Sequence, residues 1–109
     1  LVKTEDARAS VVETGLASDR STVAKATYEL MTTDLRDELG RITIPVEVVY
    51  AYDPIYGVPA DRIDATFRSA YARADTAQFI RIDDSFHFVM LDQPEEFAQA
   101  VRAFLAAGG

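Results

Sequence analysis

Cysteine is absent from the 109 residues, and histidine occurs only once, at His87. The lack of cysteine excludes disulfides, thiolate zinc sites, iron–sulfur clusters and cysteine nucleophiles. No run of residues is long and apolar enough to span a membrane. Charges interrupt the opening stretch LVKTEDARAS, where an export signal needs a continuous apolar segment. We therefore expect a cytoplasmic protein.

Basic residues are also scarce: 11 Lys and Arg stand against 18 Asp and Glu, which gives a net charge of -7. An acidic surface repels both the phosphate backbone of nucleic acids and anionic lipid headgroups. We therefore expect neither a nucleic acid nor a membrane as partner. The remaining composition, 49% hydrophobic and 27% charged, is that of an ordinary globular protein. The length corresponds to one domain or to a piece of one.

Helical patterns dominate the first third of the chain. A short helix is predicted from residue 4 to about 16, and a better one from 21 to about 32 with Ser21 as its N-cap. Asp34 is then expected to cap a short helix over 35–39, which Gly40 ends.

The second half of the chain alternates between strand and helix patterns. Residues 42–53, with Val46 to Tyr50 as centre, and residues 77–82 are rich in Val, Ile, Tyr and Phe, which favour strands. Amphipathic spacing predicts a helix from 61 to about 73 between them, and Pro94 opens a closing helix. The order strand, helix, strand, helix predicts a parallel βαβ unit followed by a helix.

An acid and the histidine follow the two predicted strands. Asp53 comes directly after the first strand, and His87 lies about five residues beyond the second. Because the carboxyl ends of parallel strands meet at one edge, where ligands bind in open α/β sheets, we expect the two side chains to lie close together. Asp53 would then orient His87, and the other ring nitrogen would serve as a general base. Taken singly, His87 also fits a structural histidine and Asp53 a turn former.

No serine of the chain has the surroundings of a catalytic nucleophile. None lies in a G-x-S-x-G turn between a strand and a helix. Ser85 is two residues from His87, but no helix start provides oxyanion donors beside it, so it is interpreted as a small loop residue. The sequence therefore predicts a base and its orienting acid without an attacking group.

From about Thr33 to Leu105 the sequence resembles the C-terminal part of the α/β-hydrolase fold. The resemblance lies in TDLRDELGRITIPVEVVYAYD, with its I-x-x-P-V strand that ends at an acid, and in FIRIDDSFHFVMLDQPEEFAQAVRAFL, with a small residue, x and His after a strand. It implies that His87 matches the catalytic histidine and Asp53 the triad acid. Phe86 departs from the family, which more often has glycine before the histidine, and Ala51-Tyr52 replaces another usual glycine. Asp61 and Asp64 are the fallback acids.

The resemblance implies an α/β fold: the C-terminal βαβα part of an α/β-hydrolase sheet over residues 34–109, preceded by the end of a helical cap over residues 1–33. Two strands alone leave edges and faces uncovered, so this part is expected to be incomplete as a standalone domain. The missing N-terminal part of the core is expected from the same protein or from a separate chain.

The expected function is hydrolysis of carboxylic esters or similar small acyl substrates by a Ser-His-Asp triad whose serine lies outside the chain. No cofactor and no metal is expected, and the chain alone is predicted to be inactive. The alternatives within the resemblance are epoxide hydrolases, dehalogenases, carbon–carbon bond hydrolases and perhydrolases. A non-catalytic ligand-binding protein and a self-sufficient small α/β module are further alternatives.

Overall fold

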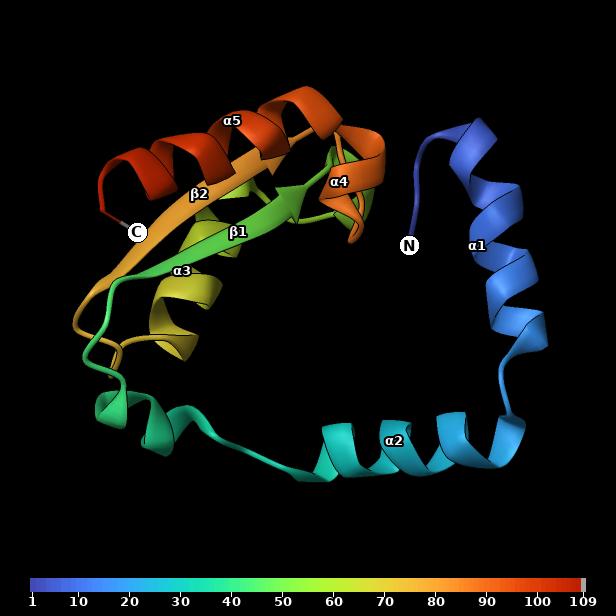
Figure 1. The fold of residues 1–109 in the computed structure, drawn as a ribbon, viewed down its shortest axis with the longest axis horizontal. Coiled ribbons are helices and arrows are strands. Elements are labelled where there is room, and N and C mark those ends of the chain that lie inside the picture. The colour runs from blue at the N-terminus through green and yellow to red at the C-terminus, as the bar shows by residue number, and fades with distance from the viewer. Residues whose placement is uncertain (109) are drawn as a thin grey trace.

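The structure is a computed structural model that describes residues 1–108 (Figure 1). Two helices, α1 (Glu5–Ala17) and α2 (Arg20–Thr32), come first, and the 3₁₀ helix η1 (Arg36–Arg41) follows. The second half contains β1 (Val46–Tyr52), η2 (Pro54–Tyr56), α3 (Ala60–Ala70), β2 (Ala77–Asp83), α4 (Val89–Asp92) and α5 (Pro94–Ala106). The predicted helix and strand positions of this half are confirmed to within a few residues.

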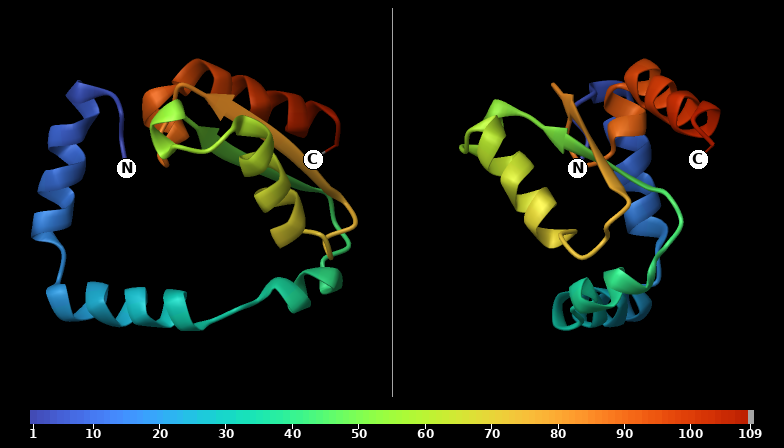
Figure 2. Two further views of the ribbon diagram at one scale, coloured as in Figure 1. Left: turned by 180° about the vertical axis from the view of Figure 1, so that it is seen from behind. Right: turned by 90° about the vertical axis from the view of Figure 1, so that its left-hand side faces the viewer.

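The two strands pair in parallel over their whole length, from Val46 opposite Ala77 to Tyr52 opposite Asp83. Helices α3 and α5 cover opposite faces of the pair, as the edge-on view in Figure 2 shows. On the α3 face, Tyr50 stacks on Phe67 with ring centroids 4.3 Å apart. Ile82, on the α5 face, is 1% exposed. The sheet thus has a small core on each side, and both strands end at the same rim.

Helices α1 and α2 form an arm that stands apart from the sheet: in Figure 1, α1 runs away from the N-terminus near the rim, and α2 leads back towards η1. Neither helix has a buried residue. The N-cap of α2 is Asp19, whose carboxylate accepts a hydrogen bond from the Thr22 backbone N–H at 2.8 Å. The prediction of Ser21 as the cap is wrong, because Ser21 lies in the first turn and donates its hydroxyl to the same carboxylate. The assignment of residues 1–33 to a cap stays a prediction.

The predicted fold class is wrong. Helices make up 58% of the chain, so it is a small, mostly helical domain with one two-stranded parallel sheet, and not the C-terminal βαβα part of an α/β-hydrolase sheet. The physical reason is that the two strands pair only with each other in the described residues. Each keeps one unpaired edge, so no larger sheet is built.

The described chain exposes more surface than a compact protein of its mass. Its accessible surface is 8210 Å², against about 6000 Å² for a folded monomer of 12 kDa. Its radius of gyration is 15.8 Å, against about 13 Å for a compact domain of this length. Large apolar side chains contribute to this surface in both the arm and the closing helix; among the most exposed are Leu16, Leu30, Met31 and Leu105. Leu105, near the end of α5, is 66% exposed.

Candidate functional site

The carboxyl rim of the sheet brings together the loops in which Asp53 and His87 lie. The backbone N–H of Ser85 donates a hydrogen bond of 3.3 Å to the carbonyl of Tyr52, the last residue of β1. Between β2 and Ser85 the chain turns at Asp84, which has a φ of 55°. Aspartate tolerates this left-handed backbone conformation better than most residues. The bond therefore ties the loop after β2 to the point where β1 ends.

Asp53 is only 5% exposed, and both oxygens of its carboxylate accept hydrogen bonds. Oδ1 accepts from the Ile55 backbone N–H at 2.9 Å, which caps η2, and Oδ2 accepts from the ammonium of Lys3 at 2.7 Å. The bond from Lys3, followed by that from Ile55, lowers the pKa of Asp53. This carboxylate is therefore held in its ionised form, as an orienting acid must be.

His87 lies in the exposed part of the loop between β2 and α4. Its ring meets that of Phe88 edge to face, with centroids 5.2 Å apart and an interplanar angle of 64°. Among residues 1–108 its imidazole takes part in no side-chain hydrogen bond, so the expected bond from the His87 ring to the Asp53 carboxylate is not formed. The structure brings the acid and the histidine to one rim without pairing them.

Lys3 is a rim residue that the sequence reading missed. Its ammonium bonds to Asp53 and also to Asp84, so it connects the loops that follow the two strands. These bonds raise its pKa, with Asp53 the larger cause and Asp84 the next. Local sequence patterns do not predict these contacts, since Asp53 and Asp84 lie 50 and 81 residues from Lys3 in the chain.

Asp92 is the second rim residue that the sequence analysis missed. Its carboxylate accepts backbone N–H bonds from Lys3 at 2.9 Å, from Thr4 at 2.8 Å and from Phe86 at 2.9 Å. Partial burial opposes ionisation of Asp92, but these three bonds outweigh it and lower its pKa to about 2. Asp92 thus joins the first residues of the chain to the loop that carries His87.

The fallback acids lie elsewhere. Asp64 accepts hydrogen bonds of 2.7 Å from the Tyr50 hydroxyl and from Arg81, which places it between α3 and the sheet. Asp61 is exposed in the first turn of α3. Like Asp53, neither has a hydrogen bond to His87 among those of the described residues.

Ser85 has the structural role that was predicted for it. Its side chain is fully buried, and its hydroxyl donates to the carbonyl of Phe86 at 2.9 Å. A nucleophile must reach its substrate, and this hydroxyl is already bonded and out of contact with solvent.

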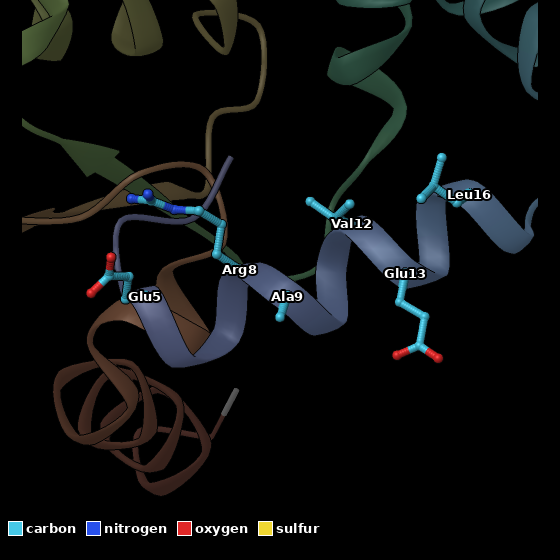
Figure 3. A pocket seen from close by; sticks show the side chains of 6 residues that line it. All are labelled: Glu5, Arg8, Ala9, Val12, Glu13 and Leu16. Carbon is cyan, nitrogen blue, oxygen red and sulfur yellow. The ribbon is translucent and has the colours of Figure 1, made fainter.

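The surface hollows of the described residues add little to the rim. The one drawn in Figure 3 is lined from α1 alone and is therefore one face of a single exposed helix, with lining residues Glu5, Arg8, Ala9, Val12, Glu13 and Leu16. A second hollow lies between α1 and the His87 loop, where Leu1, Val11, Phe88 and Leu91 line it. Tyr56, which tilts against Phe86 at 6.1 Å between centroids, brings a third aromatic ring to this side of the rim.

Within residues 1–108, no cluster of three or more His, Asp and Glu side chains has the arrangement needed to hold a metal ion. No helix of the same residues is both long and apolar enough to cross a membrane. Comparison with protein-family models, with curated proteins and with solved structures finds no match for this chain.

Proposed function

We propose that this chain supplies the histidine and the acid of a serine-type hydrolase that acts on carboxylic esters or similar small acyl substrates. The observation that carries the proposal is the Ser85–Tyr52 backbone bond, which holds the loops of His87 and Asp53 at one rim. The ionised, nearly buried carboxylate of Asp53 and the exposed ring of His87 fit the two roles. A general base has to meet substrate, whereas its orienting acid works best away from water.

In this reaction His87 takes the proton of a serine hydroxyl as the serine oxygen attacks the acyl carbon. Asp53 stabilises the imidazolium that forms, and His87 then returns the proton to the leaving alcohol. A water molecule, deprotonated by the same ring, hydrolyses the acyl-enzyme and releases the acid and the free serine. His87 and Asp53 thus act in both halves of the reaction, acylation and hydrolysis of the acyl-enzyme. The reaction also needs a serine hydroxyl, and no serine of the chain is in a suitable position.

The serine must come from a polypeptide outside these residues, and the exposed surface supports such a partner. The accessible surface of the chain exceeds that of a compact monomer of its mass by roughly 2000 Å². This excess, counted on one partner only, is already of the size that obligate interfaces bury. The free edge of β1 adds a row of unpaired backbone groups that another segment can bond. Both features fit a partner that is permanently associated, within one protein or between two.

The test compares the chain alone with the longest product of its gene. We expect the chain alone to leave p-nitrophenyl acetate unhydrolysed, and the longer product to hydrolyse it and to react with a fluorophosphonate probe. His87→Ala should lower the turnover of the longer product at least 1000-fold, in line with the loss of a triad histidine. Asp75→Asn, a change of an exposed carboxylate between α3 and β2, is the matched control and should leave the rate unchanged. Unchanged turnover in His87→Ala, or turnover by the chain alone, would contradict the proposal.

A second candidate is a non-catalytic ligand-binding protein, and the Lys3–Asp53 ion pair favours it. In that case the buried carboxylate serves to hold the first residues of the chain against the rim. This candidate predicts that the longer product neither reacts with the fluorophosphonate probe nor turns over the ester, and that Lys3→Met affects stability alone.

A further inference from the structure

The first four residues of the chain are bound along the rim by several independent contacts. The carbonyl of Leu1 accepts from the Phe88 N–H at 3.1 Å, and the N–H groups of Lys3 and Thr4 donate to Asp92. The side chain of Val2 is buried, with 5% exposed. Residues 1–4 thus lie against the loop that carries His87. Their contacts hold the backbone both before and after Lys3.

The Lys3 side chain lies between a buried carboxylate and an exposed one. Asp53 has 7% of its side chain exposed, whereas Asp84 has 71% exposed. The ammonium therefore has two partners of different kinds, one inside the rim and one at its surface. It can leave Asp53 and still keep a charge partner in Asp84.

We propose that residues 1–4 act as a latch that keeps Asp53 from His87. In the latched arrangement Lys3 and Ile55 occupy the two oxygens of Asp53, and the imidazole has no acid partner among residues 1–108. In the released arrangement Lys3 pairs with Asp84 alone, and Oδ2 of Asp53 accepts a hydrogen bond from His87. The latch regulates the site only if Asp53 and His87 act as proposed above, so it deepens that function.

Competition for one oxygen gives the latch its physical basis. An ammonium and an imidazolium are both strong donors to a carboxylate, and a nearly buried oxygen with one short bond leaves little room for a second. The bond of Lys3 to Asp53 is 2.7 Å, a short charge-assisted contact. Binding of a partner or substrate that displaces residues 1–4 would release Asp53 and complete the pair.

The test follows the imidazole of His87 by NMR in the whole 109-residue chain. Because His87 is the only histidine, its ring signals need no assignment by mutation. In Lys3→Met, which keeps the stem of the side chain and removes the charge, we expect the pKa of His87 to rise by about 1 unit, since an ionised carboxylate has become its neighbour. Lys3→Arg, which can still pair with Asp53, should behave as the unmodified chain.

A double-mutant cycle separates the latch from the mere loss of a positive charge. The charged groups around the rim are Lys3, Asp53, Asp84 and Asp92, with Arg8 bonded to the Lys3 carbonyl. Loss of the Lys3 charge alone would raise the pKa of His87 equally in the presence and absence of Asp53. The latch predicts that the rise largely disappears when Asp53→Asn is combined with Lys3→Met.

A pKa of His87 that stays the same in Lys3→Met, or one that rises equally in the Asp53→Asn background, would overturn the latch. Lys3→Gln provides a second uncharged variant if Lys3→Met does not fold, and the same rise is expected. This readout does not involve catalysis, so an inactive longer product with the expected NMR shift would refute the hydrolase while the latch stands.

Discussion

The ammonium of Lys3 lies 2.7 Å from the carboxylate of Asp53, although 50 residues separate the two in the chain. This ion pair connects the segment before α1 with the end of β1. In this structure the carboxylate of Asp53 bonds to Lys3 and to the Ile55 backbone N–H, and not to His87. The pair thus holds the residues before α1 against the rim of the sheet.

Replacing Asp92 by Asn should destabilise the chain by about 1–3 kcal/mol, because the backbone N–H groups of Lys3, Thr4 and Phe86 lose a charged acceptor. A neutral amide presents one oxygen, and its NH₂ group faces donors. Urea unfolding measures the change in free energy, and amide hydrogen exchange should accelerate at Lys3 and Thr4. Asp75→Asn, exposed and without a hydrogen bond in the described residues, is the control. Equal midpoints for the two variants would show that Asp92 does not hold the first residues in place.

Acid should weaken the chain through the same carboxylate. The pKa of Asp92 in the folded chain is about 2, below the ordinary value of 3.8, so its contribution is fully present above about pH 4. The contribution is lost as the pH falls from 3.8 through 2, because the unfolded state takes up a proton at a higher pH than the folded state does. Thermal melting at a series of pH values should show a smaller decline below pH 4 in Asp92→Asn than in the unmodified chain. A parallel decline in both would assign the acid sensitivity to other carboxylates.

The strands could be predicted because their signal is local. Runs of β-branched and aromatic residues define β1 and β2, and parallel pairing follows from the helix between them. The common rim for Asp53 and His87 could be inferred from that topology. The fold class could not be predicted in the same way, since a resemblance in a few segments does not show how many strands pair beside β1.

The ion pairs of the rim were beyond sequence reasoning for a different reason. Lys3 and Asp92 are 89 residues apart, and each stands in a stretch that local patterns describe as a tail or a helix end. Their contact depends on the folding of β1, α3 and β2, which brings Asp92 back beside the first residues. Periodicity and capping rules contain no information about such distances, so the partner of Asp53 was predicted to be His87 when the structure has Lys3 there.

Tyr50 links α3 to the sheet by a hydrogen bond as well as by stacking. Its hydroxyl donates to Asp64 at 2.7 Å, and its ring stacks on Phe67. Tyr50→Phe keeps the stack and should cost about 1 kcal/mol for the lost bond. Tyr28→Phe, on α2 and 70% exposed, is the control and should leave the urea midpoint unchanged. A midpoint for Tyr50→Phe equal to that of the unmodified chain would mean that water replaces Asp64 without loss.

Alkaline titration gives an independent measure of the same side chain. Burial, followed by the bond to Asp64, raises the pKa of Tyr50 to about 12 from the ordinary value of 10. The folded state therefore holds this proton more tightly, and the stability that depends on it is complete below pH 10 and is lost as the pH rises through 12. Burial also raises the pKa of Tyr56, so ultraviolet titration should show late ionisation of more than one tyrosine. The step near pH 12 should be absent in Tyr50→Phe. An unchanged titration curve, apart from a smaller amplitude, would place the Tyr50 hydroxyl in solvent.

Two isoleucines offer a direct comparison of the core with the surface. Ile82, at the end of β2, is 1% exposed, whereas Ile55, in η2, is 72% exposed. Ile82→Val should lower the free energy of unfolding by about 0.5–1.5 kcal/mol, and Ile82→Ala by about 2–5 kcal/mol, because a cavity remains between the sheet and α5. Ile55→Val and Ile55→Ala remove the same atoms from a side chain that is already in water, and urea midpoints should shift little. Since the described core is small, a large loss at Ile55 or a negligible one at Ile82 would mean that the sheet and α5 do not pack in solution as they do here.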